Sequence, residues 1–158
     1  MRDVGISDLS IRLSCPADHR ALLQLWERSV RATHNFLTEA DIDFFRPLVG
    51  QYFDSSTDIW VLTDKADVPI GFLGLDGNSI AALFMEPAYF GKGGGQRLVS
   101  YAQTLRGGAL TVDVNEQNAA ARGFYEALGF SVVDRSPLDD NGRPFPILHM
   151  RRENHASL

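Results

Sequence analysis

Residues 79–105 read SIAALFMEPAYFGKGGGQRLVSYAQTL, in which an apolar run, a glycine-rich turn and an amphipathic pattern follow one another. The run from Ser79 to Met85 predicts a strand, and the last stretch has the i, i+3, i+4, i+7 apolar spacing of a helix. Between them lies the glycine loop, Gly91 to Gly95, whose four glycines permit unusual backbone conformations and remove side chains that would keep a ligand away. Successive N–H groups can then converge on an anion at the positive end of the helix, next to Lys92. The loop predicts a phosphate-binding site.

The glycine loop on its own does not identify the ligand. A tight or flexible connection that binds nothing is one open alternative, and an unrelated nucleotide-phosphate site is another. The dinucleotide-binding fingerprint is excluded because it needs a glycine three positions after Gly93, where Gln96 stands. A Walker A loop is excluded because Gly93, rather than Ser or Thr, follows Lys92.

The segments before the loop predict two helices and four strands. Leu22, Trp26 and Val30 recur at four-residue spacing, which predicts a helix over roughly residues 17–33. Thr38 opens a second helix, which we expect Pro47 to bend or interrupt. Strands are expected at residues 10–13, 59–63, 69–75 and 79–85, the last two joined by a hairpin at Asp76-Gly77.

The segments after the loop predict one more strand, a helix and a final pair of strands. Residues 110–114 alternate as a strand, and residues 121–128 form a helical stripe that Gly129 ends as a left-handed cap. Strands are expected at 130–133 and 145–150. The order is therefore β-α-α-β-β-β-α-β-α-β-β. We interpret residues 1–158 as a single mixed α/β domain with its core over 10–150 and a C-terminal tail, 151–158, that frays.

Composition narrows the class of protein. The 158 residues are 44% apolar and 22% charged, as in an average soluble domain. The net charge of −5 argues against a nucleic-acid partner, whose phosphates require a basic face. Cys15 is the one cysteine, so no internal disulfide is possible. No secretory signal is recognisable and the apolar run Ile80 to Met85 is too short for a membrane span, so we expect no membrane partner and a cytoplasmic location.

Two motifs make the chain resemble the GNAT superfamily of N-acetyltransferases over roughly residues 10 to 150. Residues 83–95, LFMEPAYFGKGGG, are similar to the family's strand, Pro-bearing turn and pyrophosphate loop, [RQ]-x-x-G-x-[GA]. Residues 115–130, NEQNAAARGFYEALGF, are similar to its N-x-x-A…F-Y-x-x-x-G-F signature, and residues 28–37, RSVRATHNFL, resemble the YjaB-like branch. One position departs from the family pattern: Phe90 stands where the loop usually begins with Arg or Gln.

The resemblance implies the GNAT (acyl-CoA N-acyltransferase) fold, an α/β fold with a mixed, mostly antiparallel sheet flanked by helices. It also implies acetyl-CoA as the cosubstrate and no metal. The central strands that end at Met85 and Val114 are expected to splay, and the pantetheine arm to pair with one of them like an added strand. A backbone N–H there can polarise the thioester carbonyl. The cofactor-binding residues implied are Leu83, Phe84, Met85, Gly91, Lys92, Gly93, Gly94, Gly95, Gln96, Asn118 and Phe124.

Acetyl transfer to an amine also requires acid and base groups. An alkylamine with a pKa near 10.4 is protonated at pH 7, so forming its free base costs about 4–5 kcal/mol, while the departing thiolate needs a proton that a tyrosine can supply. By resemblance this acid is Tyr125, whose place on an apolar helical stripe is equally typical of a core residue. His34 borders the acceptor site in the family and can bind the amine or relay its proton, or it is a helix-terminal histidine that interacts with the dipole. Glu86 is a candidate base or a solvated turn residue.

Other polar residues are given no catalytic role at this stage. Asp113 is expected to be exposed or to make a structural hydrogen bond, and His149 has no catalytic context. No metal cluster and no Ser-His-Asp triad are expected.

The sequence therefore predicts an enzyme that transfers acetyl directly from acetyl-CoA to a primary amine of a small molecule, protein or peptide, without an acyl-enzyme intermediate. A non-catalytic acyl-CoA sensor or interaction module with the same fold is the alternative. The identity of the acceptor and of the general base stays open, as does the choice between monomer and homodimer.

Overall fold

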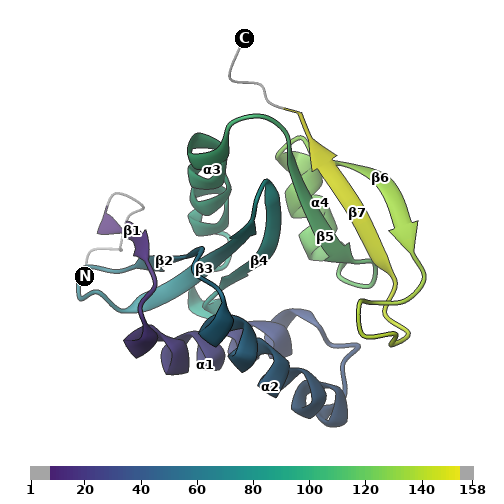
Figure 1. Cartoon of the computed structure of the whole chain (residues 1–158), viewed down its shortest axis with the longest axis horizontal. Helices are drawn as coiled ribbons and strands as arrows, with labels where there is room; N and C mark the ends of the chain where they lie inside the picture. Colours follow the sequence, from purple (N-terminus) through teal and green to yellow (C-terminus); the bar gives the residue numbers. More distant parts are fainter. Residues whose placement is uncertain (1–7, 154–158) are drawn as a thin grey trace. The chain divides into compact units, whose positions relative to one another are not determined.

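The computed structural model describes residues 8–153 and confirms the predicted order of helices and strands (Figure 1). Two short 3-10 turns, Pro16–Asp18 and Pro87–Tyr89, are added to it. The main elements are β1 Ser10–Leu13, α1 His19–Thr33, α2 Glu39–Ser55, β2 Ile59–Thr63, β3 Pro69–Asp76, β4 Ser79–Met85, α3 Gly94–Arg106, β5 Leu110–Asn115, α4 Ala119–Ala127, β6 Ser131–Ser136 and β7 Ile147–Arg152.

The strands form one seven-stranded sheet in the order β1-β2-β3-β4-β5-β7-β6. The pairs β1–β2, β2–β3, β5–β7 and β6–β7 are antiparallel, whereas β4 and β5 are parallel. The predicted mixed, mostly antiparallel sheet is confirmed. By its internal contacts the chain divides into two compact units, residues 1–74 with 82–100 and residues 75–81 with 101–158, so β3 and β4 each run through both.

The first unit packs α1 and α2 against its strands, and the two helices lie side by side (Figure 1). Its core joins residues of both helices to residues of β2 and β3, and Phe53 meets Phe72 edge-on at 5.2 Å between ring centroids. Burial of each large apolar side chain stabilises the fold by about 1.5–3 kcal/mol. The buried residues are Leu22, Leu25, Trp26, Val30, Ile42, Phe53, Ile59, Val61 and Phe72.

Helix α2 begins after Thr38, as the sequence predicts, but Pro47 does not interrupt it. Thr38 caps the helix, because its hydroxyl accepts from the Asp41 N–H while the Asp41 carboxylate accepts from the Thr38 N–H. Pro47 lies on the exposed side inside the helix, which continues to Ser55. The predicted interruption is wrong, and we attribute this to the burial of Ile42 and Phe53 on either side, which offsets the one backbone hydrogen bond that proline cannot make.

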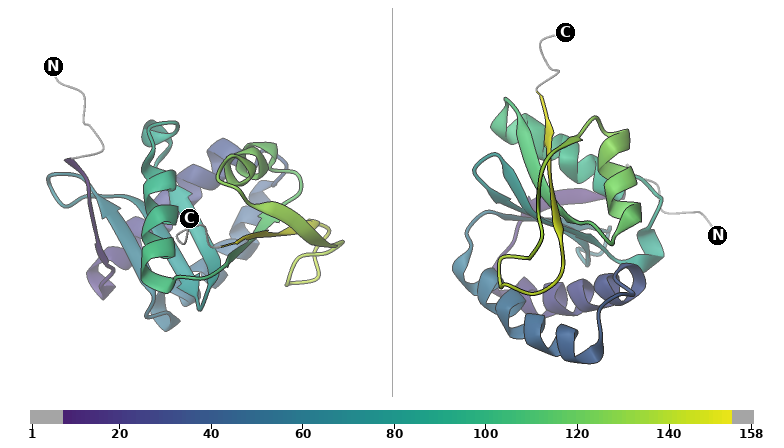
Figure 2. Two further views of the ribbon diagram at one scale, coloured as in Figure 1. Left: turned by 90° about the horizontal axis from the view of Figure 1, so that it is seen from above. Right: turned by 90° about the vertical axis from the view of Figure 1, so that its right-hand side faces the viewer.

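The second unit is an antiparallel ladder of β5, β7 and β6, with α4 on one of its faces (Figure 2). At its other edge β5 pairs with the start of β4, at Ser79–Thr111 and Ile80–Val112. Alternate residues of β5 are buried, so Val112 and Val114 face the core and Asp113 faces the opposite side. Strand alternation thus gives β5 two faces of different chemistry.

The last two strands differ from their predicted bounds. β6 runs to Ser136 instead of ending at 133, and β7 runs to Arg152. Arg151 and Arg152 were predicted to belong to a frayed tail, but both pair with β5, and Arg151 also pairs with β6. The remainder of the predicted tail, residues 154–158, lies outside the described residues.

Candidate active site

The glycine loop joins β4 to α3, as predicted, but the helix begins inside it. Gly94 and Gly95 belong to the first turn of α3, so the irregular turn is limited to residues 91–93. Gly91 has φ +73° and Gly93 has φ +87°, conformations that residues with a β-carbon rarely adopt. A β-carbon at either residue would meet no atom within 4 Å, so the space beside the turn is open.

The start of α3 is held in place by Met85, the last residue of β4. A β-carbon at Gly94 would lie 2.5 Å from Met85 Cε and 3.1 Å from Leu62 Cδ2, and one at Gly71 of β3 would overlap the Met85 sulfur. The first backbone hydrogen bond of the turn runs from Arg97 N to Gly93 O. The N–H groups before it have no partner within the helix, so they form the positive end of α3 where an anion binds well.

The side chains around this turn are exposed. Lys92 and Gln96 extend from it, and 39% of the Phe90 surface is accessible. Phe90, at the position where the resemblance leads us to expect Arg or Gln, is therefore not a core residue. An arginine at position 90 would have room without disturbing the packing of the first unit.

Glu86 follows β4 and is paired with α1. Its two carboxylate oxygens accept hydrogen bonds from Arg28 Nε and Nη2, both at 2.7 Å, and 21% of its side chain is exposed. A bidentate guanidinium pair of this kind occupies both carboxylate oxygens. The geometry favours a role for Glu86 in joining α1 to the end of β4.

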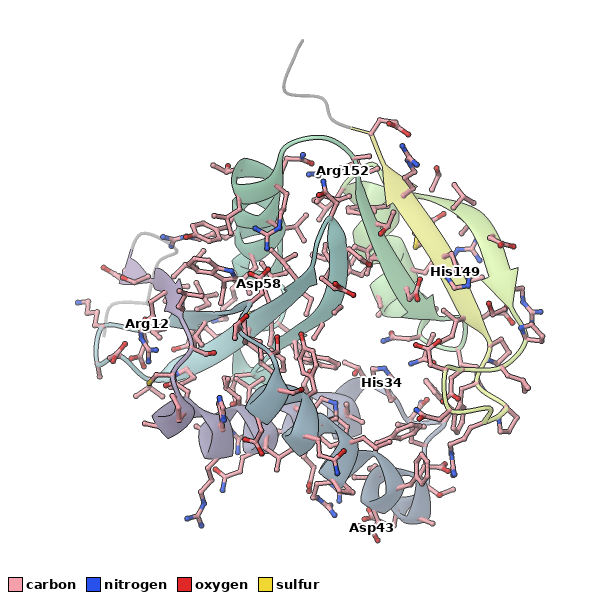
Figure 3. All side chains as sticks on the ribbon, viewed as in Figure 1. Arg12, His34, Asp43, Asp58, His149 and Arg152 are labelled. Carbon is pink, nitrogen blue, oxygen red and sulfur yellow. The ribbon has the colours of Figure 1, made fainter. Side chains whose placement is uncertain are left out.

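His34 ends α1 with a defined arrangement of its ring (Figure 3). The Thr33 hydroxyl donates to the Ser29 carbonyl at 2.8 Å and lies 2.7 Å from His34 Nδ1. Because the hydroxyl has one proton, Nδ1 must carry a proton and donate to Thr33 Oγ1, which leaves the lone pair on Nε2. Burial lowers the pKa of His34 to about 4. His34 is thus a neutral imidazole at physiological pH.

The remaining predicted residues lie in the second unit, on or beside α4. Tyr125 is buried, and its ring packs edge-on against Phe124 at 5.0 Å and Phe130 at 5.3 Å. Burial raises the pKa of the Tyr125 phenol well above its ordinary value, so the hydroxyl keeps its proton. Asn118 is buried and caps α4, because its Oδ1 accepts from the Ala121 N–H at 3.1 Å. The amide NH₂ of Asn118 is left to donate.

One arrangement in the second unit was missed at the sequence level. Asp113 of β5 lies 2.6 Å from His149 Nδ1, and Ser136 Oγ lies 2.7 Å from His149 Nε2. Sequence reasoning predicted no Ser-His-Asp triad and did not foresee this hydrogen-bonded chain, although it did expect Asp113 to be exposed or to make a structural hydrogen bond. The strand register brings the two residues together, because Asp113 of β5 is directly opposite His149 of β7. The spacing of these residues in the sequence does not reveal that register.

Residues 8–153 contain neither a cluster suited to bind a metal ion nor a helix suited to cross a membrane. That part of the chain holds no group of three or more His, Cys, Asp or Glu residues arranged to bind a metal ion. None of its helices combines the length and apolar character that crossing a membrane requires.

Comparison with known proteins gives a consistent family signal. Residues 55–132 match the family described as acetyltransferase (GNAT) domain. Over 142 residues the chain is 42% identical to the peptidyl-lysine N-acetyltransferase YjaB of Salmonella typhimurium, covering 90% of this chain and 97% of that protein. The solution structure of apo-form YjaB from Escherichia coli matches with a TM-score of 0.85 at 39% identity, over 90% of this chain and 96% of that one. The PaiA N-acetyltransferase of Thermoplasma acidophilum, solved in complex with coenzyme A, shares the fold with a TM-score of 0.72 at 21% identity, over 92% and 98%.

The state of the His34 ring is directly testable by nuclear magnetic resonance. We expect a pKa of about 4 and the Nδ1–H tautomer at neutral pH. Because this pKa lies below the value of about 6.5 in an unfolded chain, the unfolded state binds more protons between the two values. Stability is then lost as the pH falls from about 6.5 towards 4, and His34→Gln should reduce that loss.

The matched control is Thr33→Val, which keeps the shape of residue 33 but removes the oxygen that accepts from Nδ1. It should weaken the tautomer preference while α1 stays folded. An ordinary histidine pKa, or an Nε2–H tautomer in the wild type, would contradict the assigned geometry.

Proposed function

The chain belongs to the GNAT family of acetyltransferases, and on that basis we propose that it transfers the acetyl group of acetyl-CoA directly to lysine side chains of a protein or peptide. The observation that carries this proposal is the start of α3, which combines first-turn N–H groups without a partner in the helix, two glycines at positive φ and the exposed Lys92. The choice of lysine is supported by YjaB, a peptidyl-lysine N-acetyltransferase that is 42% identical over 90% of this chain.

In this proposal the glycine loop binds the pyrophosphate of the cosubstrate. The donors are the N–H groups at the start of α3, with Lys92 and Gln96 beside them. The open space next to Gly91 and Gly93, where a β-carbon would meet nothing, suits a phosphate that approaches the backbone closely. Local donors of this kind allow a protein with a net charge of −5 to hold a polyanion.

The acyl end of the cosubstrate is assigned to the backbone of β4. Leu83 and Met85 would pair with the pantetheine arm, and an N–H there would polarise the thioester carbonyl as negative charge develops on its oxygen. The NH₂ of Asn118 is a donor for the same arm. Phe84 and Phe124, both half-buried, supply apolar surface.

Tyr125 is assigned as the acid for the departing thiolate. The amine nitrogen forms a bond to the carbonyl carbon, the carbon–sulfur bond breaks and the phenol donates its proton to the sulfur. The proton that the nitrogen loses on becoming an amide restores the phenol. With ordinary pKa values near 10 for tyrosine and 8.5 for a thiol, complete proton transfer is uphill by about 2 kcal/mol. Burial raises the pKa of Tyr125 further. A thiolate in the same desolvated environment also becomes a stronger base, which restores the match between the two groups.

His34 and Glu86 are assigned supporting roles on the acceptor side. An imidazole with a pKa of about 4 is a weak base towards an alkylammonium, but its Nε2 lone pair can accept a hydrogen bond from the acceptor amine and orient it. Glu86, through its bidentate pair with Arg28, would fix the end of β4 against α1.

If the glycine loop binds the pyrophosphate, two substitutions in it should weaken coenzyme A binding and a third should strengthen it. Gly93→Val and Lys92→Glu should weaken coenzyme A binding strongly, because one changes a backbone at positive φ and the other reverses the local charge. Phe90→Arg should tighten binding by about 1–2 kcal/mol, the value of a charge-assisted contact. Calorimetric titration at two salt concentrations measures all three.

The controls are Gly142→Val, which changes another glycine at positive φ, and Lys65→Glu, which reverses the charge of another exposed lysine. Both should leave coenzyme A affinity unchanged. If Gly93→Val and Lys92→Glu bind as the wild type does, the pyrophosphate site lies elsewhere.

If Tyr125 is the acid, Tyr125→Phe should lower turnover without changing the affinity for coenzyme A. The change deletes one hydroxyl, so the fold and coenzyme A affinity should persist while kcat falls by about 10²-fold. Tyr101→Phe, which removes a hydroxyl from α3, should keep wild-type kcat. Wild-type turnover in Tyr125→Phe would make Tyr125 a core residue without a catalytic role.

The acceptor class is tested by offering acetyl-CoA with three amines: a lysine peptide with a blocked N-terminus, a lysine-free peptide with a free N-terminus, and a polyamine. Thiol release gives the rate, and mass spectrometry locates the acetyl group. We expect Nε-acetyl-lysine as the main product. Preferred acetylation of the N-terminus or the polyamine would overturn the lysine assignment, and no transfer to any amine would favour a sensor.

A further inference from the structure

Lysine is scarce in this chain, and one of its two lysines stands in the glycine loop. Of the 15 Lys and Arg residues, two are lysines, Lys65 and Lys92, and the rest are arginine. An arginine contacts a phosphate through two N–H groups at once, whereas a lysine contacts it as a point charge. Binding of the pyrophosphate alone would therefore favour arginine at position 92. Lysine has a second property that arginine lacks, because its amine can lose a proton and accept an acetyl group.

The surroundings of Lys92 leave its amine accessible. The residue is exposed, and within residues 8–153 its ammonium makes no ion pair and no side-chain hydrogen bond. Gly91 and Gly93 stand on either side of it, and a β-carbon on either glycine would meet no atom within 4 Å. The turn is thus open on both sides of Lys92, so the surface of another molecule can approach its backbone closely.

Lys65 provides an internal comparison. It is exposed as well, but it lies in the turn between β2 and β3, which the Asp64 carboxylate braces. Asp64 Oδ1 accepts hydrogen bonds from Ala66 N at 2.8 Å and from Val68 N at 3.0 Å, and Asp64 N donates to the Val68 carbonyl at 3.1 Å. A segment fixed in this way cannot extend into the acceptor site of another protein as readily as the turn around Lys92.

We propose that Lys92 is a site of self-acetylation, at which one copy of the chain acetylates the glycine loop of another. This proposal rests on the proposed function, acetyl transfer to lysine. The neutral Lys92 nitrogen forms a bond to the carbonyl carbon of the acetyl-CoA that the other copy holds. The carbon–sulfur bond breaks, and coenzyme A leaves as a thiol with the proton that the nitrogen gives up. The product is Nε-acetyl-Lys92, which carries no charge.

The acetyl group must come from another copy because of the way in which the cosubstrate is proposed to bind. Its pyrophosphate lies at the glycine loop, and its thioester lies at the backbone of Leu83 and Met85. The pantetheine arm therefore separates Lys92 from the acetyl group that is bound to the same copy. Transfer between two copies is second order in protein, and this distinguishes it from a reaction within one copy.

The same site makes the empty copies the substrates. In a copy that holds acetyl-CoA, the Lys92 ammonium lies against the pyrophosphate, and its amine is not available for attack. The rate then follows the product of loaded and empty copies, so it is greatest when the two are equal in number and falls when acetyl-CoA saturates the protein. Loss of the Lys92 charge weakens the pyrophosphate site, so acetylated copies stay empty.

The kinetic test incubates the protein with acetyl-CoA and follows acetylation at positions 65 and 92 by mass spectrometry. Lys92 should be acetylated at least about tenfold faster than Lys65. The fraction of Lys92 modified per minute should rise in proportion to the protein concentration and should pass through a maximum as acetyl-CoA is increased. Uncatalysed acetylation, by contrast, gives a fraction that does not depend on protein concentration and rises steadily with acetyl-CoA.

The binding test does not depend on turnover. Nε-acetyl-lysine introduced at position 92 should raise the Kd for coenzyme A about tenfold in calorimetry, because a charge-assisted contact is lost. The same residue introduced at position 65 is the matched control and should leave the Kd unchanged. After incubation with acetyl-CoA and removal of the ligand, Lys65→Arg should lose affinity as the wild type does, whereas Lys92→Arg should keep its own starting affinity.

A lysine peptide with a blocked N-terminus, added to a parallel reaction, separates this inference from the function on which it rests. Acetylation of the peptide together with an unmodified Lys92, or with equal modification of Lys65 and Lys92, would overturn self-acetylation and leave the proposed function intact. A fraction independent of protein concentration would overturn transfer between copies. A steady rise with acetyl-CoA would overturn the empty copy as the substrate, and an unchanged Kd with acetyl-lysine at 92 would overturn the effect on binding. If neither the peptide nor Lys92 is acetylated, the proposed function fails as well.

Discussion

The side chain of Met85 fills a space that exists only because Gly71 and Gly94 have no β-carbon. This packing ties the end of β4 to β3 and to the first turn of α3, so the strand, the turn and the helix start form one piece. With the helix start fixed there, the chain must turn back through Gly91 and Gly93 at positive φ. That contact fixes where α3 begins, and therefore where its first-turn N–H groups, on which the proposed cosubstrate site depends, are located.

Much of the fold could be predicted because its signals are local. The strand-turn-helix around the glycine loop, the Thr38 cap and the stop at Gly129 depend on periodicity and on residues near them in the chain. The errors arise where distant residues decide the outcome. Helix α3 begins at Gly94, inside the predicted loop, because Met85 holds it there, and α2 passes Pro47 because burial on both sides stabilises it.

For the candidate site, too, local motifs identify residues, whereas contacts between distant residues could not be predicted. The loop residues and Tyr125 could be named from motifs, but their environments could not. The pairing of Glu86 with Arg28 joins residues 58 apart, and the contact of His149 with Asp113 joins residues 36 apart. Such contacts depend on the strand register and helix packing of the folded chain. The raised pKa of Tyr125 and the lowered pKa of His34 are likewise properties of the fold, because burial causes both.

The most direct test of this account is a titration of the isotopically labelled protein with coenzyme A, followed by backbone amide spectra. Exposed N–H groups that receive a phosphate change their hydrogen bonding on binding, so their resonances should move most. We predict that the largest changes occur at the amides of residues 91–97, with smaller changes at Leu83 and Met85. Unchanged amides at 91–97 in a sample that binds coenzyme A elsewhere would contradict the account at its central point.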